Sequence, residues 1–253
     1  MVPPPGIPLV TRDGREEPHA VLCRGVEKSF AAGESRVHVL RGTDFAARAG
    51  EMTFLVGPSG CGKTTLISII GAILSCDAGE VEVLGTSLRS LSGGRLADFR
   101  LRNLGFIFQQ FNLLPALTAV ENASIPLVAR GTPIRRAERA AADMLHRLGM
   151  DGHARKMPAQ LSGGQQQRVA IARALVHGPR LVICDEPTAS LDAASGHQVM
   201  ELLRETALAP GRAVVIVTHD NRIFEFADVI HRMADGRVTA VESIVPMATG
   251  GSA

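Results

Sequence analysis

A glycine-rich octapeptide constrains the fold of this chain more than any other segment: Gly57-Pro58-Ser59-Gly60-Cys61-Gly62-Lys63-Thr64. It matches the pattern GxxxxGK[ST] and lies between a short apolar run, Met52–Val56, and an apolar run typical of a helix. Glycines at these positions let successive backbone N–H groups turn towards one anion, and the helix that follows points its positive end at the same anion. Lys63 adds a charge for the β- and γ-phosphates, and Thr64, followed by Thr65, offers a hydroxyl to Mg²⁺. The segment therefore predicts a nucleotide phosphate site between a buried strand and a helix.

Cys61 lies inside this loop, and two interpretations of it stay open. It is either a small residue that the loop tolerates or a reactive thiol activated by the positive end of the following helix. The other cysteines are Cys23, Cys76 and Cys184, and no two of the four form a CxxC pair. A zinc site or a disulfide framework is therefore not expected.

Strands and helices are expected to alternate along most of the chain. Two strands, at residues 21–30 and 37–46, flank a turn at Gly33 and Glu34. Further strands are expected at residues 52–56, 80–84, 104–108, 181–184 and 213–217. Helices are expected at residues 64–74, 162–176 and 193–207, followed by a short helix and a hairpin that turns at Asp235 and Gly236. This alternation predicts an α/β fold with a mostly parallel sheet covered on both faces, joined to an N-terminal antiparallel β portion.

A helical block interrupts the alternation. Residues 118–149 have a helical pattern throughout, apart from a break at Gly131-Thr132-Pro133. We therefore expect an α-helical subdomain at about residues 111–160, inserted into a main domain that spans residues 20–246. Residues 1–19, which contain five prolines, are expected to form a disordered tail, and the small, polar residues 247–253 a loose one.

Two strand ends carry groups that suit hydrolysis of a nucleotide. Asp185 and Glu186 follow one apolar strand, and His219 follows another. Because the carboxyl ends of parallel strands meet at one edge of a sheet, these side chains are expected beside the phosphate loop. There Asp185 can face Mg²⁺, Glu186 can act as a general base towards water, and His219 can contact the γ-phosphate and orient that water. Without the phosphate loop, the acids could equally be solvated residues at a strand end, and the histidine a structural residue.

A second anion-facing helix end is expected at Leu161-Ser162-Gly163-Gly164-Gln165-Gln166-Gln167-Arg168. Ser162 is a good N-cap, and the two glycines leave backbone N–H groups open to an anion. A similar tetrapeptide at residues 91–94 is followed by Arg95-Leu96-Ala97 instead of a glutamine run. We expect that second copy to be only a polar turn.

With these motifs in this order, the chain resembles the ATP-binding-cassette (ABC) ATPases over about residues 21–242. The resemblance implies a P-loop NTPase (RecA-like) core that binds ATP and Mg²⁺ and hydrolyses ATP. Residues 57–64, with Lys63 assigned to catalysis, resemble the Walker A loop. Asp185 resembles the Walker B aspartate, Glu186 the catalytic glutamate and His219 the switch histidine. The family's head-to-tail homodimer implies that the signature residues contact ATP held by a second copy: Ser162, Gly163, Gly164 and Gln165.

Three further segments carry the same resemblance. Gln109 resembles the Q-loop glutamine, which contacts ATP and Mg²⁺ and joins the core to the helical subdomain. Phe30 falls where the family places an aromatic ring that stacks on adenine, and residues 189–192 resemble the D-loop. Residues 105–122 and 218–228 resemble the macrolide-exporter and lipoprotein-release type of ABC ATPase.

This resemblance also implies partners and a location. ATPases of that type work with a separate integral membrane permease, and many export or extract hydrophobic cargo. We therefore expect a peripheral subunit at the cytoplasmic face of the inner (plasma) membrane, with a permease, a second ATPase subunit and a periplasmic adaptor as partners. The apolar residues 111–115, beside Gln109, are our candidate for permease docking; alternatively, they pack the core of the helical subdomain.

The composition bounds the alternatives. A net charge of +2 over 253 residues is too balanced to suggest a nucleic-acid partner, and none is expected. No apolar run approaches the ~20 residues needed to span a bilayer. The alternative function is that of a non-transport ABC ATPase in translation or DNA repair. Translation members usually carry two cassettes in one chain and repair members a long coiled coil, whereas this sequence shows one cassette and no sustained heptads.

Overall fold

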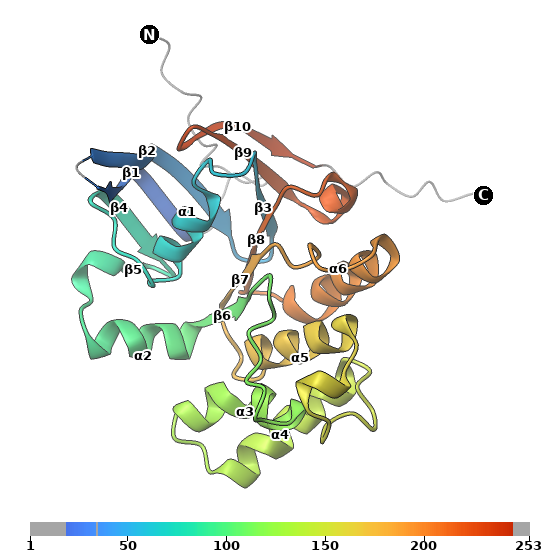
Figure 1. The fold of residues 1–253 in the computed structure, drawn as a ribbon. Coiled ribbons are helices and arrows are strands. Elements are labelled where there is room, and N and C mark those ends of the chain that lie inside the picture. The colour runs from blue at the N-terminus through green and yellow to red at the C-terminus, as the bar shows by residue number, and fades with distance from the viewer. Residues whose placement is uncertain (1–18, 34, 245–253) are drawn as a thin grey trace.

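The computed structural model describes residues 19–33 and 35–244. The predicted tails, apart from residue 19, and Glu34 of the predicted turn lie outside the described residues. The described part contains two sheets with helices around them (Figure 1).

The first sheet is antiparallel and has the strand order β2-β1-β4-β5. Its strands are β1 (His19–Ala32), β2 (Ser35–Arg48), β4 (Ala78–Val83) and β5 (Thr86–Ser87). The expected N-terminal antiparallel portion is therefore confirmed, with longer strands than the sequence indicated. It gains β4 because that strand, which follows the phosphate loop in the chain, pairs with β1.

The second sheet has six strands in the order β10-β9-β3-β8-β7-β6. These strands are β3 (Met52–Val56), β6 (Leu104–Ile107), β7 (Leu181–Asp185), β8 (Ala213–Thr218), β9 (Val229–Ala234) and β10 (Arg237–Ser243). All neighbours are parallel except β10, which forms the expected hairpin with β9. This is the predicted mostly parallel core.

The period-two alternation of the central strands separates two hydrophobic layers. Phe54 of β3 and Ile216 of β8 face a cluster that includes helices α3 to α6. Leu55 and Val215, their sequence neighbours, face the opposite cluster, which contains α1 and the inner face of the antiparallel sheet. The parallel sheet is thus buried on both faces, and the polar residues at its strand ends are left to build a site.

The helices are α1 (Lys63–Ile70), α2 (Gly94–Asn103), α3 (Ala119–Ala129), α4 (Ile134–Arg147), α5 (Gly163–Leu175) and α6 (Ala193–Ala207). Short 3-10 helices lie at Leu88–Ser90, Pro158–Gln160 and Asn221–Phe226. The expected helical pair with a break near Gly131 is confirmed as α3 and α4, and α3 begins with a capping box between Thr118 and Glu121. α5 packs against both helices, although the sequence placed the end of the helical subdomain at about residue 160. The boundaries of that subdomain remain a prediction.

One local expectation was wrong, and one helix was not predicted. The helix expected at residues 64–74 ends at Ile70, because Ala72 has a left-handed backbone (φ 56°) and Gly71 packs against the Phe106 ring. The polar turn expected at residues 91–94 is present, with Ser92 and Gly93 exposed, but the sequence did not predict helix α2, which begins at Gly94. α2 was missed because none of its residues is fully buried and no side chain caps its start.

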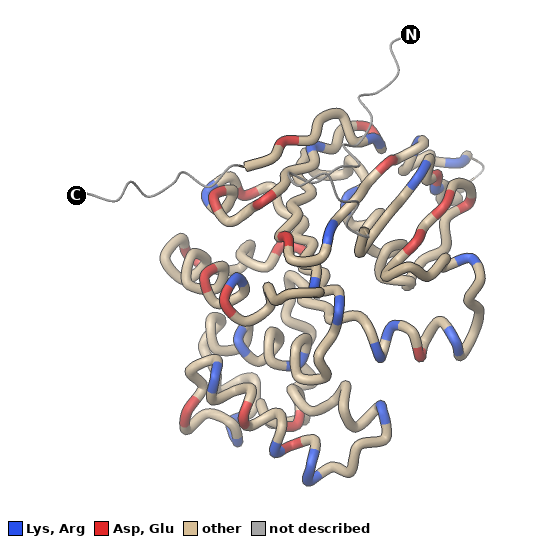
Figure 2. Tube along the Cα trace, turned by 180° about the vertical axis from the view of Figure 1, so that it is seen from behind, with Lys and Arg blue, Asp and Glu red and all other residues tan. Residues whose placement is uncertain are grey.

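The surface charge is mixed. Figure 2 shows acidic and basic positions interspersed along most of the described chain, in keeping with its small net charge. None of the helices within the described ranges has the length and apolar character needed to span a bilayer.

Candidate nucleotide-binding and catalytic site

The phosphate loop joins the carboxyl end of β3 to the start of α1 (Figure 1). Two of its glycines are required by its geometry. A Cβ at Gly57 would lie 2.1 Å from the carbonyl oxygen of Met233, and Gly62 has a φ of 107°, which disfavours any side chain. The loop therefore turns tightly against β9 and presents its backbone at the N-terminus of α1.

Lys63 is held across this loop. Its Nζ donates to the carbonyl oxygens of Gly57 at 2.8 Å and Pro58 at 2.9 Å, and the side chain is buried. The Cys61 sulfur lies 3.9 Å from the same amine. An ammonium group in this position provides a fixed positive charge at the mouth of the loop, as a phosphate site requires.

The ends of β7 and β8 lie beside the loop because of the strand register. Val56 pairs with Thr218 of β8, and Asp185 of β7 pairs with Val217. Glu186 follows with a left-handed backbone (φ 51°), which its N–H stabilises by donating to the Val217 carbonyl oxygen at 2.9 Å. A non-glycine residue in this conformation is strained, and such strain is common at functional sites.

Glu186 and His219 form a pair. Oε1 of Glu186 lies 2.7 Å from Nδ1 of His219. The other carboxylate oxygen, Oε2, is buried and has no protein hydrogen-bond partner among the described residues. A buried carboxylate oxygen without a partner is unfavourable unless a ligand or water occupies its free position. The geometry thus leaves one oxygen of Glu186 available to a reactant.

Neighbouring groups shift the pKa of the Asp185 carboxyl in opposite directions. Burial and the neighbouring Glu186 carboxylate raise its pKa, while the Lys63 ammonium and a hydrogen bond with Thr64 partly offset that rise. A cation bound here would remove the cost of the buried charge. No group of three His, Cys, Asp or Glu side chains suited to a metal occurs within residues 19–33 and 35–244. One carboxylate beside a hydroxyl fits Mg²⁺, which takes few protein ligands and relies on waters and substrate phosphates.

Most of the predicted site residues line one cavity of about 920 Å³. Its walls are formed by Phe30, Val39, Pro58, Ser59, Gly60, Gly62, Lys63, Thr64, Thr65, Gln109, Asp185, Glu186 and His219. Gly57 and Cys61 do not line it, since Gly57 packs against Met233 and Cys61 is buried. Val39 of β2 is the one lining residue that the sequence did not indicate, because it belongs to no motif and comes from the antiparallel sheet.

The signature residues lie in a different hollow, of about 520 Å³. Its lining includes Ser162, Gly163, Gly164 and Gln165 together with the predicted D-loop residues Ser190, Leu191 and Asp192. Ser162 caps α5 as expected, accepting from the Gln165 N–H. One chain therefore separates the two anion-facing helix ends instead of joining them.

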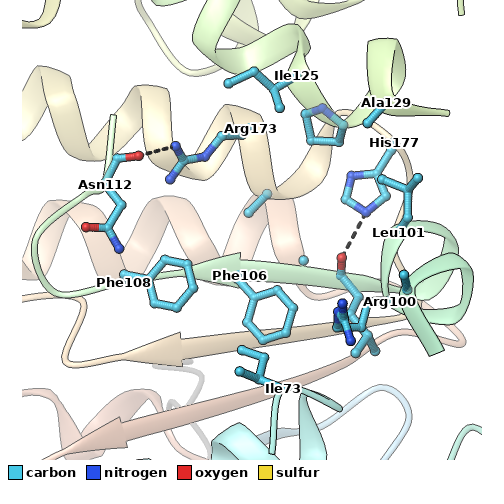
Figure 3. A pocket seen from close by; sticks show the side chains of 15 residues that line it. Ile73, Arg100, Leu101, Phe106, Phe108, Asn112, Ile125, Ala129, Arg173 and His177 are labelled. Atoms are coloured by element: carbon cyan, nitrogen blue, oxygen red, sulfur yellow. Dashed lines mark hydrogen bonds between the residues drawn. The ribbon is translucent and has the colours of Figure 1, made fainter. Parts of the chain in front are cut away.

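An apolar groove lies between α2, β6 and α3, with a volume of about 540 Å³ (Figure 3). Ile73, Leu101, Phe106, Phe108 and Ile125 supply its apolar lining, and Arg173 borders it. Phe111 and Leu114, which the sequence suggested for docking, are outside this lining. Leu114 is 50% exposed, and Leu113 packs against the main core, as the alternative interpretation of this segment expects.

Arg173 fixes the segment that connects Gln109 to the helical layer. Its guanidinium donates to the carbonyl oxygens of Phe111 and Asn112, both at 2.6 Å. Those two residues have left-handed backbones, with φ of 53° and 49°. Because each is a non-glycine residue, these contacts stabilise an otherwise unfavourable turn.

Comparison with known proteins identifies the chain. The family model described as "ABC transporter" matches residues 40–189, which include the phosphate loop, the signature and β7. The chain belongs to the ABC transporter family, as its ATP-binding domain. The resemblance drawn from the motifs is thereby confirmed.

Relatives of this ABC domain include single-domain and larger proteins. An uncharacterized ABC transporter ATP-binding protein of Thermotoga maritima is 41% identical over 217 residues, which is 86% of this chain and 92% of that protein. A macrolide export ATP-binding/permease protein of Sodalis glossinidius is 42% identical over 220 residues, 87% of this chain but 34% of that protein. The chain spans about a third of the length of the curated export ATP-binding/permease relatives that it matches.

A solved structure agrees with this ABC fold. A dimeric, post-hydrolysis state of the ATP-binding cassette MJ0796, bound to ADP and Pi, superimposes with a TM-score of 0.81 at 36% identity. The match covers 88% of this chain and 98% of that one. The P-loop NTPase fold expected from the sequence is confirmed.

Proposed function

We propose that this ABC domain is the ATP-binding and ATP-hydrolysing subunit of an export system. The observation that carries the proposal is the 920 Å³ cavity, where Lys63, Asp185, Glu186 and His219 converge on one phosphate loop. The similarity to export ATP-binding/permease proteins favours transport over the alternative role in translation or DNA repair.

Each group has a chemical task in the proposed reaction. The loop N–H groups and Lys63 hold the phosphates, and the exposed ring of Phe30 stacks on adenine. The free oxygen of Glu186 accepts a proton from the attacking water, while His219 holds the other oxygen and orients the carboxylate. Thr64, Asp185 and Gln109 would hold Mg²⁺, which when bound neutralises charge on the phosphates.

The separation of the two hollows supports a homodimer. The signature residues of one chain lie in a hollow apart from its own phosphate loop, so they can contact ATP only on another subunit. A two-fold dimer would bring each signature onto the partner's loop and create two composite sites. The dimeric state of the MJ0796 cassette, with ADP and Pi bound, is consistent with this arrangement.

ATP hydrolysis tests the enzymatic part of this proposal. The purified chain should release phosphate from ATP in the presence of Mg²⁺, and Lys63→Ala should lower its affinity for ATP. Lys156→Ala, which changes a lysine outside the cavity, serves as the matched control. Equal nucleotide binding by all three proteins would contradict the assignment of the phosphate site.

A separate integral membrane permease is the proposed partner, and the apolar groove beside the Q-loop is its docking surface. The groove lies next to Phe108 and Asn112, on both sides of Gln109, so movement at the γ-phosphate side can reach the partner. We also propose a peripheral location on the cytoplasmic face of the inner membrane, a hydrophobic cargo and a periplasmic adaptor, on the strength of the export relatives.

The docking proposal is tested by co-purification with the permease in detergent. Ile73→Asp changes a groove residue that is 52% exposed, and Leu114→Asp changes the exposed residue that the sequence suggested. Ile134→Asp, at a 61% exposed position on α4, is the control outside the groove. Loss of permease with Ile73→Asp, and not with the Ile134→Asp control, would place the site in the groove. Retained permease with Ile73→Asp would refute the groove as the docking surface, whatever the result with Leu114→Asp.

A further inference from the structure

One imidazole beside the signature helix determines how Gln165 is held. Oε1 of Gln165 accepts from the backbone N–H of Ser162 at 3.0 Å. Its other terminal atom, Nε2, lies 3.0 Å from Nε2 of His153, a half-buried residue in the segment between α4 and α5. The Gln165 side chain therefore bridges the cap of the signature helix and this histidine.

These contacts allow one form of the ring. The Ser162 N–H can only donate, so the Gln165 oxygen faces it and the Gln165 amide N–H points at His153. Nε2 of His153 must then accept. Nδ1 lies 2.6 Å from the carbonyl oxygen of Asp151, which can only accept, so Nδ1 carries the proton. The neutral Nδ1–H tautomer satisfies both contacts.

The same arrangement leaves the Ser162 hydroxyl free to act. Its oxygen accepts from the backbone N–H of Gln165 at 3.3 Å, while its own proton has no acceptor among the contacts of the described residues. That proton is available to an anion in the signature hollow, which Ser162 and Gln165 both line. In the proposed dimer, this anion is the phosphate of ATP bound to the other subunit.

We propose that His153 is a positioning residue for the signature motif, whose neutral ring holds Gln165 in the orientation that caps α5. This inference rests on the proposed function, because the signature acts there on ATP. A proton added at Nε2 would set two donors against each other. Gln165 would have to turn its amide, which removes Oε1 from the Ser162 N–H and disturbs the anion-facing end of α5.

The charged groups around this ring have other contacts or face solvent. The carboxylate of Asp151 lies 2.6 Å from His146 at the end of α4. Arg168 of α5 donates to the Leu148 carbonyl oxygen at 2.8 Å. In the same segment, Arg155 is exposed and Lys156 is half-buried. His146 is the other imidazole of this region, and its hydrogen bond with Asp151 raises its pKa.

Steady-state ATP hydrolysis between pH 5.5 and 8.5 tests the proposal with two variants. His153→Phe keeps a ring but has no acceptor, and we expect kcat to fall about fivefold at pH 8 through loss of one hydrogen bond. ATP binding to the separate phosphate loop should be unchanged. His153→Gln places an amide oxygen near the former Nε2, so it should retain kcat at pH 8 and lose less activity than wild type at pH 6.

His146→Gln is the matched control, because it removes an exposed imidazole from the same region without touching Gln165. It should follow the wild-type pH profile. Wild-type kcat in His153→Phe, or a His153→Gln profile that coincides with wild type at acid pH, would overturn the proposal.

A ¹⁵N histidine NMR spectrum gives a readout that does not depend on activity. His153 should show a protonated Nδ1 and an unprotonated Nε2 at pH 8, and a protonated Nε2 there would overturn the inference. A wild-type chain that hydrolyses no ATP would instead contradict the proposed function, and the tautomer would still decide the inference.

Discussion

His231 should make the stability of this domain fall steeply with acidity. The residue lies in β9, only 1% exposed, with its ring 4.7 Å from that of Phe45. Burial lowers its pKa to about 4, although a hydrogen bond with the Ala46 backbone favours the charged form. Its Nδ1 is buried without a hydrogen-bond partner among the described residues. The folded state therefore holds the neutral ring.

The sign and size follow from proton linkage. The unfolded chain binds the proton near pH 6.5 and the folded state only near pH 4, so acidification between these values favours unfolding. The free energy of unfolding should fall by about 3 kcal/mol across the whole window, and by about 2 kcal/mol between pH 7 and pH 5. Well below pH 4 the ring is protonated in both states, so the loss of stability grows no further. Above about pH 7 the ring is neutral in both states, and His231 causes no loss.

Urea unfolding of wild type and His231→Phe at pH 7 and pH 5 measures this contribution. Both proteins share the other titrating groups, so the difference between their pH dependences isolates His231. We expect the wild type to lose about 2 kcal/mol more than the variant. His231→Leu is the second variant if the larger ring does not pack. Equal losses in wild type and a folded variant would refute the reasoning.

Three further outcomes follow from the site. Ser162→Arg should leave ATP binding by the monomer intact and abolish ATP-dependent dimerisation in light scattering, because a bulky cation fills the signature hollow. A maleimide should inactivate the chain slowly through Cys61, which is 6% exposed, with protection by ATP; unchanged inactivation of Cys61→Ser would place the sensitive thiol elsewhere. Arg173→Ala should lower the free energy of unfolding, measured in urea, by about 2 kcal/mol, because two charge-assisted hydrogen bonds to left-handed residues are lost. An unchanged value would show that Arg173 does not stabilise this turn.

The position of the phosphate-loop site could be predicted because its residues follow strands whose ends a parallel sheet brings to one edge. Asp185, Glu186 and His219 could be placed beside the phosphate loop for that reason, and the register of β3, β8 and β7 puts them there. Val39 could not be found, since it reaches the cavity from the antiparallel sheet, whose position depends on long-range packing.

Exposed and strained segments were the other source of error. α2 has no fully buried residue and no capping side chain at its start, so its sequence lacks the signals that mark the beginning of a helix. The left-handed Phe111 and Asn112 depend on Arg173, about 60 residues away in the chain, and no local signal shows that contact. The role that we propose for His153 depends in the same way on the meeting of two segments.

The most direct test of the central claim is the behaviour of Glu186→Gln with ATP. This variant keeps the phosphate loop and Lys63 but lacks the carboxylate oxygen proposed to accept the proton from water. Size exclusion with light scattering and a phosphate-release assay should show an ATP-bound dimer that accumulates and turnover that is lost. Near-normal turnover, or failure of the variant to bind ATP, would contradict the account.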